Sequence, residues 1–187
     1  KNKVARIFNM GCGPAKEIQD FLRHRSTDQR TDFTLVDFND ETLAYTSKTL
    51  SDIARKYDSP TEIRLIKKSV NQLIKEAFKL QSSSEKYDIV YCAGLFDYLS
   101  DPICKKLLNV FYDLVAPGGL LIATNVDDSN PSKGWMEFVL DWHLVYRNGS
   151  QFAHLRPDAA SSDDLIVRSV GTGVNIFLEV RKPENVR

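Results

Sequence analysis

The stretch from residue 4 to residue 15, VARIFNMGCGPA, constrains the fold of this chain more than any other. Its apolar first half has the composition of a β-strand that stops at Gly11, Cys12 and Gly13, and Pro14 then opens a segment with helical spacing. Backbone N–H groups at the start of such a helix point at whatever lies above the strand, and glycine permits close approach because it has no Cβ. A strand, tight turn and helix of this kind can hold a small ligand.

The rest of the chain alternates between strand-like and helix-like segments. Apolar runs predict strands at residues 31–38, 63–68, 87–93 and 120–124. Apolar residues at spacings of three and four predict helices at residues 15–25, 40–57, 72–80 and 103–114. Short connections between such units imply right-handed crossovers and a parallel sheet with helices on both faces. We therefore predict a doubly wound α/β fold.

The C-terminal end breaks this alternation. Residues 165–170 and 174–180 read as two strands that are joined only by Gly171, Thr172 and Gly173. So short a connection can join only antiparallel strands. We expect a mostly parallel seven-stranded sheet with a C-terminal antiparallel hairpin, preceded by a polar surface loop at residues 156–164.

Length and composition limit the kind of protein that this chain forms. Its 187 residues, 42% of them hydrophobic, suffice for one domain, which we expect to span residues 1–187 and to lack an N-terminal segment. Lys and Arg balance Asp and Glu at 25 each, which argues against nucleic acid as a partner. Cys12, Cys92 and Cys104 form no C-x-x-C pair and favour reduced thiols in a cytoplasmic protein over a disulfide framework or a metal site. No apolar run approaches the roughly 20 residues of a membrane span.

Ligands of an open α/β sheet bind beyond the carboxyl ends of the strands. Asp37 ends the second predicted strand, where a carboxylate can accept hydrogen bonds from both hydroxyls of a ribose. The same aspartate could instead cap the helix that starts near Asp40. A dinucleotide fingerprint needs a third glycine where this chain has Lys16, and the C-terminal hairpin is foreign to the usual dinucleotide-binding sheet. NAD is therefore the less favoured nucleotide.

Five motifs occur together in the order and spacing of one enzyme family. They are NMGCGPA, LVDF, YDIVYCAGLFDYL, APGGLLIATN and the closing hairpin. Together they resemble the class I S-adenosylmethionine-dependent methyltransferases over residues 4–182. The resemblance implies a Rossmann-like domain that moves a methyl group from S-adenosylmethionine to a small-molecule acceptor and releases S-adenosylhomocysteine.

The resemblance also implies a cofactor that lies across the carboxyl ends of the first, second and fourth strands. Gly11, Cys12 and Gly13 would pass under its methionine part, and Asp37 would hold the ribose. Phe38 would lie beside the adenine ring, or would simply be a core residue. The loop of Ser69, Val70 and Asn71 would contact the edge of the adenine ring. The loop of Cys92, Ala93 and Gly94 would contact the ammonium group of the methionine part. Many family members have an aspartate in the loop that contacts adenine, whereas this chain has no aspartate among residues 69–71. Cys12 and Cys92 would be wall residues and not nucleophiles.

A narrower resemblance concerns the last third of the chain. The segments GWMEFVLDWHLVYRN and TGVNIFLEVRK are similar to a bacterial subgroup described as making methyl esters of 3-hydroxy fatty acids. This resemblance implies that the acceptor is the carboxylate of a fatty or other organic acid. Such an acceptor is already ionised near neutral pH and needs no general base.

An aromatic stripe lies within this region. Trp135, Phe138, Val139, Trp142 and Tyr146 recur at helical spacing. Such a stripe is either part of the core or a wall of the acceptor site, because it follows the fifth strand and can fold over the mouth of the cavity.

Four residues are candidates for contacts with the acceptor: Tyr98, His143, Tyr146 and Arg147. Tyr98 follows the fourth strand, beside Asp97, which either touches the acceptor or caps the next helix. His143 and Arg147 are four apart and would share a neighbouring face of one helix. An arginine can grip a carboxylate and a histidine can accept a proton, although Arg147 can equally be a surface charge and His143 a structural residue. A hydroxyl or amine acceptor would need a base, for which His143 or Tyr146 are candidates.

Two other functions stay open. The domain could bind the cofactor without turnover, as a sensor or partner module, and incubation with labelled cofactor and lipid-acid extracts would separate this function from an active enzyme. It could also be an NAD-dependent oxidoreductase, which Lys16 disfavours and which a fluorescence titration with NADH would test.

Overall fold

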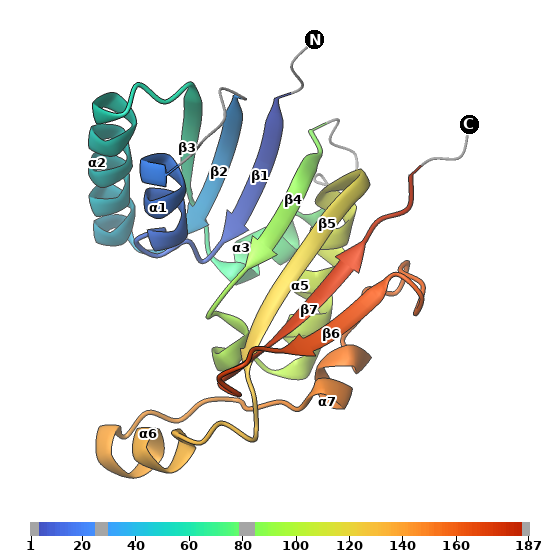
Figure 1. The fold of residues 1–187 in the computed structure, drawn as a ribbon. Coiled ribbons are helices and arrows are strands. Elements are labelled where there is room, and N and C mark those ends of the chain that lie inside the picture. The colour runs from blue at the N-terminus through green and yellow to red at the C-terminus, as the bar shows by residue number, and fades with distance from the viewer. Residues whose placement is uncertain (1–3, 25–29, 79–84, 185–187) are drawn as a thin grey trace.

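One mixed β-sheet organises the molecule (Figure 1). The structure, a computed structural model, describes residues 4–24, 30–78 and 85–184. Its strands are β1 (Ala5–Met10), β2 (Thr31–Asp37), β3 (Thr61–Lys67), β4 (Tyr87–Cys92), β5 (Val115–Val126), β6 (Leu165–Ser169) and β7 (Asn175–Arg181). They run in the order β3-β2-β1-β4-β5-β7-β6, and β7 pairs antiparallel with both β5 and β6 while the other pairs are parallel. The predicted doubly wound sheet with its C-terminal antiparallel hairpin is confirmed.

The helices cover the sheet unevenly. They are α1 (Lys16–His24), α2 (Asp40–Lys56), α3 (Val70–Lys75), the 3-10 helix η1 (Phe96–Tyr98), α5 (Asp101–Leu114), α6 (Lys133–Leu140) and α7 (Gly149–His154). In Figure 1, α1 and α2 lie over β1, β2 and β3 on one face, while α3, α5 and α7 lie on the other. Among the described residues, no helix combines the length and the apolar character needed to cross a membrane.

Two apolar cores hold these layers together. The larger core lies between the sheet and α5, where Phe111 is fully buried and its ring centroid lies 6.3 Å from that of Phe8 on β1. The second core, which includes Leu22, Leu35 and Leu50, lies under α1 and α2. Because both cores contact β1, the turn that follows β1 rests on packed structure on either side of the sheet.

Half of one sheet face carries no helix in the described part of the chain. On the side of α1 and α2, the strands β5, β7 and β6 face outward without a helix over them (Figure 1), whereas Tyr91 on β4 donates to Glu17 of α1 at 2.6 Å. Ile122 and Phe177 lie partly exposed on this side, and Arg168 of β6 lies over the Phe177 ring at 5.3 Å while its Nε donates to Glu179 at 2.7 Å. The open half is therefore a mixed apolar and charged surface.

The structure corrects the predicted helix that would have carried the aromatic stripe. Helix α6 ends at Leu140, because Asp141 adopts the left-handed conformation with φ of 49°. Trp142 and Tyr146 therefore do not continue the helical face of Trp135. Helix α6 buries none of its side chains and projects beyond the carboxyl ends of the strands (Figure 1), so the interpretation of the stripe as core is wrong for its helical part.

Smaller differences concern the ends of elements. Strand β5 begins at Val115 and runs through Pro117 and Gly119, which we expected to separate a helix from a strand. The short helix α7 was not predicted, since its six residues carry only the capping box of Asn148 and Gln151 as a local feature. Helix α3 begins at Val70, and the predicted helical residues 79–80 lie outside the described residues.

Candidate functional site

A cavity of about 330 Å³ lies at the carboxyl ends of the central strands. Its lining comes from the segments that follow β1, β2, β3 and β4, as the sheet topology predicts for a ligand site. The lining residues are Met10, Gly11, Gly13, Asp37, Phe38, Val70, Gly94, Leu95 and Tyr98. The structure therefore brings together Gly11, Gly13, Asp37, Phe38, Val70 and Gly94 from the predicted cofactor residues, together with the predicted acceptor residue Tyr98. Sequence reasoning missed Met10 and Leu95, although both are direct neighbours of predicted glycines.

The glycine turn after β1 is tied closely to its surroundings. Gly11 and Gly13 have φ of 73° and 49°, values that glycine adopts without strain. The N–H groups of Gly11 and Cys12 both donate to the carbonyl of Val36 on β2, at 2.8 and 3.1 Å. A Cβ on Gly11 would lie 3.4 Å from the Leu95 side chain. The turn therefore approaches the segment after β4 closely, and glycine at position 11 keeps the floor of the cavity open.

Asp37 presents a carboxylate that is held in one orientation. Its Oδ2 accepts from the Gly13 N–H and its Oδ1 accepts from the Asn39 N–H, both at 3.0 Å, and the residue is buried. The cap of α2 is Asn39, whose side chain accepts from the Thr42 N–H at 2.9 Å. The alternative that Asp37 caps this helix is therefore wrong. Each carboxylate oxygen retains acceptor capacity toward the cavity, as donors on a ligand would require.

The loops after β2 and β3 form one end of the cavity. Phe38 is 69% exposed, so the interpretation of this ring as a core residue is wrong. Ser69 uses its side chain in the capping box of α3, where it accepts from the Gln72 N–H at 3.3 Å. Of the three residues predicted to read the adenine edge, only Val70 lines the cavity, and Ser69 and Asn71 do not.

Two predicted wall residues lie behind the cavity. Cys12 and Cys92 are both buried, and neither they nor Ala93 line the cavity. Burial and the nearby Asp37 carboxylate raise the pKa of the Cys12 thiol to about 12, and burial also raises the pKa of the Cys92 thiol. Both thiols therefore stay protonated near neutral pH and are poor nucleophiles.

Among the acceptor candidates, Tyr98 has the clearest position. It lines the cavity, and its hydroxyl accepts from the indole N–H of Trp142 at 3.1 Å. His143 lies at the surface with its Nε2 3.0 Å from Asp141. The Tyr146 hydroxyl is buried without a hydrogen-bond partner among the described residues, and burial raises its pKa, which disfavours a role as base. The Tyr98–Trp142 contact therefore joins the segment after α6 to the cavity.

Arg147 requires a correction. Both of its predicted roles, a surface charge and a grip for an acceptor carboxylate, need an accessible guanidinium, but its side chain is 2% exposed. Its guanidinium is already bonded to four groups inside the protein. It donates to Asp101 Oδ1 from Nε at 2.9 Å, to the carbonyls of Phe96 at 3.0 Å and Leu99 at 2.6 Å, and to Asn125 Oδ1, and its Nη2 also lies 2.8 Å from Asp101 Oδ1 as an ion pair. Arg147 therefore offers no donor to a ligand.

Asp97 lies beside this guanidinium and is itself buried. Its Oδ1 accepts from the Val126 N–H at 2.6 Å, and its carbonyl accepts from the Val145 N–H at 2.7 Å. Burial raises the pKa of the Asp97 carboxyl above its ordinary value of 3.8, a shift that the hydrogen bonds and Arg147 only partly oppose. Asp97 is thus neither a cap for α5 nor a lining residue of the cavity.

The raised pKa of Asp97 predicts a pH-dependent effect of replacing it. The folded state holds the proton more tightly than the unfolded chain, so the wild type loses stability as pH rises from 3.8 through the folded pKa. Asp97→Asn keeps an acceptor for Val126 and removes the buried charge. We expect this variant to have the higher free energy of unfolding near neutral pH, with the gain shrinking as pH falls toward 3.8.

Urea unfolding over a pH series measures this difference. Asp101→Asn is the matched control, because it leaves Arg147 without its closest carboxylate and should lower stability near neutral pH. A stability difference between Asp97→Asn and wild type that stays constant with pH would contradict the argument.

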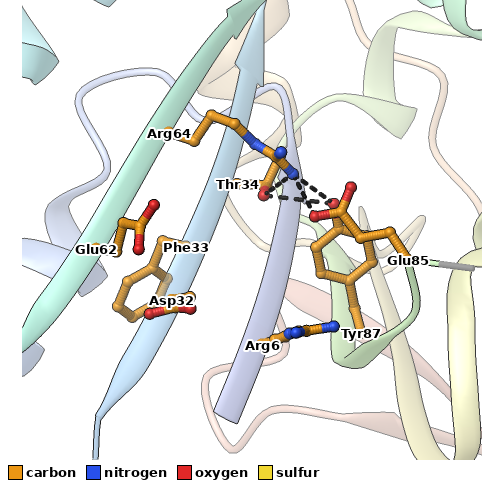
Figure 2. A pocket seen from close by; sticks show the side chains of 8 residues that line it. All are labelled: Arg6, Asp32, Phe33, Thr34, Glu62, Arg64, Glu85 and Tyr87. Carbon is orange, nitrogen blue, oxygen red and sulfur yellow. Dashed lines mark hydrogen bonds and ion pairs between the residues drawn. The ribbon is translucent and has the colours of Figure 1, made fainter. Parts of the chain in front are cut away.

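A second cavity, also of about 330 Å³, opens at the opposite edge of the sheet, at the amino ends of β1, β2 and β3. Figure 2 shows Arg64 among its lining residues, and its Nη2 donates to Thr34 at 3.0 Å, to Glu85 at 2.6 Å and to the Tyr87 hydroxyl at 3.1 Å. These groups already pair with one another. The cavity is also separated from the glycine turn by the length of the strands, so we assign it no part in the candidate site.

Comparisons with known proteins agree with this geometry. A family model described as "Methyltransferase domain" matches residues 8–121. A curated relative, "Uncharacterized protein RP028" of Rickettsia prowazekii (strain Madrid E), is 23% identical over 133 residues, which is 71% of this chain and 46% of that protein.

Solved structures share the fold at low identity. A possible exported protein from Bordetella parapertussis aligns with a TM-score of 0.70 at 19% identity, over 96% of this chain and 62% of its own. An O-methyltransferase family protein from Burkholderia thailandensis aligns with a TM-score of 0.67 at 16% identity, over 97% of this chain and 52% of its own. The N-methyltransferase NodS from Bradyrhizobium japonicum WM9, in complex with S-adenosyl-L-homocysteine, aligns with a TM-score of 0.61 at 14% identity, over 96% of this chain and 79% of its own.

These likenesses differ in what they establish. The chain spans about half the length of the curated relative and less than two thirds of the first two structures. At such identities the structural matches establish the fold alone. The family model, in contrast, covers more than half of the chain, and this chain therefore belongs to the methyltransferase domain family.

Proposed function

We propose that this domain transfers the methyl group of S-adenosylmethionine to a small-molecule acceptor. The observation that carries the proposal is the cavity in which the Gly11–Gly13 turn faces the fixed carboxylate of Asp37. S-adenosylmethionine is the cofactor and S-adenosylhomocysteine the product. The catalytically silent sensor is less favoured, because Tyr98, an acceptor candidate that contacts Trp142 just after α6, lines the same cavity.

The residues that line the cavity fit the parts of this cofactor. The oxygens of Asp37 accept hydrogen bonds from the ribose hydroxyls. The Phe38 ring and the Val70 side chain provide apolar contacts for adenine. The methionine part would lie between the glycine turn and Gly94, whose φ of 77° and empty surroundings at the Cβ position leave room for it.

The bound cofactor supplies a methyl group activated by a sulfonium. The role of this chain is then to orient the donor and the acceptor, which lowers the activation free energy by roughly 7–11 kcal/mol in favourable cases. Met10 and Leu95 line the cavity with apolar groups that exclude water. Among the described residues that line the cavity, the titratable side chains are those of Asp37, which would bind the ribose, and Tyr98, and none is a histidine or a lysine. This arrangement suits an acceptor that is already ionised.

The acceptor that we propose is an organic acid with an apolar chain, and the resemblance to the 3-hydroxy fatty acid methyl ester subgroup suggests a hydroxy fatty acid. Trp135 and Phe138 of α6 are 61% and 90% exposed, and Leu140 and Trp142, at and just after the end of this helix, add to the exposed apolar surface of this region. Trp142 contacts Tyr98 at the cavity. An apolar chain lying along this surface would bring its carboxylate to the mouth of the cavity.

Binding and transfer can be measured separately. Calorimetry should show binding of S-adenosylhomocysteine, and labelled S-adenosylmethionine with a panel of fatty acids, hydroxy acids, amines and phenols should give a base-labile ester from the acids. Binding without transfer to any acceptor would favour the sensor or partner module. A fluorescence change with NADH and none with S-adenosylhomocysteine would favour the oxidoreductase.

Trp142 is expected to set the affinity for the acceptor. Trp142→Ala removes both the indole N–H that Tyr98 accepts and the apolar contact, so KM for an acid acceptor should rise about tenfold, the equivalent of about 1.4 kcal/mol. Trp142→Phe keeps the apolar contact and should show a smaller rise. The affinity for S-adenosylhomocysteine should not change in either variant, and a matching loss of that affinity would contradict this role.

A further inference from the structure

We infer that Arg147 is a positioning residue for the methionine end of the cofactor cavity. It acts through the turn at residues 94–99, which it fastens to β5 and α5. The inference rests on the proposed function, because it treats the cavity as the cofactor site.

The hydrogen bonds of one side chain define this fastening. Phe96 is the first residue of η1, and Leu99 directly follows this helix. The Arg147 guanidinium donates to the backbone carbonyls of both residues, at 3.0 and 2.6 Å. The same guanidinium donates to Asp101 in the first turn of α5 and to Asn125 on β5. A single buried cation thus joins the turn after β4 to a helix and to a strand.

Backbone contacts hold Arg147 itself in place. The Val145 N–H donates to the Asp97 carbonyl at 2.7 Å, and the Asn125 side-chain amide donates to the Val145 carbonyl at 2.9 Å. The Arg147 N–H donates to the Val126 carbonyl at 3.3 Å. The backbone that carries the guanidinium is therefore held in place by hydrogen bonds, so the guanidinium can determine the position of the turn at residues 94–99.

The turn that Arg147 holds carries part of the cavity wall. Leu95 and Tyr98 line the cavity, and Leu95 is the side chain that a Cβ on Gly11 would approach. The other end of the cavity, with Asp37 and Phe38, belongs to β2 and the start of α2, which the second core supports. Moving the turn should therefore change the end beside β4 and spare the end beside β2.

The chemistry of the side chain explains why arginine occupies this position. A cation that is 2% exposed is costly unless it is paired and hydrogen-bonded, and here all three guanidinium nitrogens donate to protein oxygens. A planar guanidinium with five N–H groups reaches two carbonyls and two side chains at once. A lysine has three donors on one nitrogen and cannot span both ends of η1.

The test compares two ligands of different length. S-adenosylhomocysteine has the amino-acid part that would lie beside the turn, whereas 5′-methylthioadenosine lacks it. Arg147→Met keeps the approximate side-chain length and removes all donors. We expect it to weaken S-adenosylhomocysteine binding about tenfold or more and 5′-methylthioadenosine binding less than about twofold, with Arg147→Lys intermediate, by calorimetry at a temperature where circular dichroism shows folded protein.

Arg168→Met is the matched control, because Arg168 lies on β6 and pairs with Glu179 away from the cavity. It should change neither affinity. Equal weakening of both ligands in Arg147→Met, or no change in either, overturns the positioning role. If Arg147→Met does not fold, the same comparison in Arg147→Lys decides. Failure of the wild type to bind either ligand would instead overturn the proposed function, and the inference with it.

Discussion

Replacing Asp37 by alanine is expected to weaken the binding of S-adenosylhomocysteine by about 100-fold or more while the domain stays folded. Two effects combine in this result. The variant loses the carboxylate that would accept hydrogen bonds from the ribose hydroxyls. It also leaves the N–H groups of Gly13 and Asn39 without their acceptor, so the glycine turn loses one of its hydrogen bonds to the end of β2. Calorimetry measures the affinity, and thermal unfolding followed by circular dichroism checks the fold.

Two further variants separate the contributions to this loss. Asp37→Asn keeps one oxygen as an acceptor and should show a smaller loss of affinity. Asp40→Ala removes a neighbouring exposed carboxylate that pairs with Lys67 and does not line the cavity, so it should bind like the wild type. An unchanged affinity in Asp37→Ala would remove Asp37 from the cofactor site.

The second large effect concerns stability. Phe111→Ala should lower the free energy of unfolding by about 3–5 kcal/mol, because the ring is fully buried between α5 and β1 and its loss leaves a cavity. Phe138→Ala is the matched control, since the same substitution on α6 removes a ring that is 90% exposed. Its unfolding free energy should stay within about 0.5 kcal/mol of the wild type. Urea denaturation of the three proteins measures both differences.

The control variant also bears on the proposed acceptor. If the α6 surface binds an apolar chain, Phe138→Ala should combine wild-type stability with poorer use of long-chain acids. A large loss of stability in Phe138→Ala would mean that α6 packs against the protein and is not available to an acceptor.

The fold and one end of the site could be predicted because local features specify them. The glycines at 11 and 13 and the carboxylate at 37 follow directly from strand ends that the apolar pattern reveals. The mostly parallel sheet follows from the alternation of strands and helices, and its antiparallel hairpin follows from the short C-terminal connection. Each of these features depends on residues close together in the sequence.

The acceptor side could not be predicted in the same way. The helical pattern continues past Asp141, but the left-handed backbone at this residue ends α6 there. The burial of Arg147 depends on Phe96 and Leu99, which lie 51 and 48 residues earlier in the chain. A sequence pattern reveals the periodicity of helices and strands. The carbonyl groups that accept hydrogen bonds from a buried arginine come from distant parts of the sequence, so only the folded structure identifies them.

The uneven cover of the sheet has a consequence for the order in which the molecule opens. Strand β1 contacts both apolar cores, whereas β7 and the edge strand β6 have helices on one side only in the part of the chain that the structure describes (Figure 1). Regions with fewer apolar contacts undergo local unfolding at lower free energy. Fluctuations should therefore detach the hairpin of β6 and β7 first, and the glycine turn and Asp37 belong to the part of the molecule that persists longest.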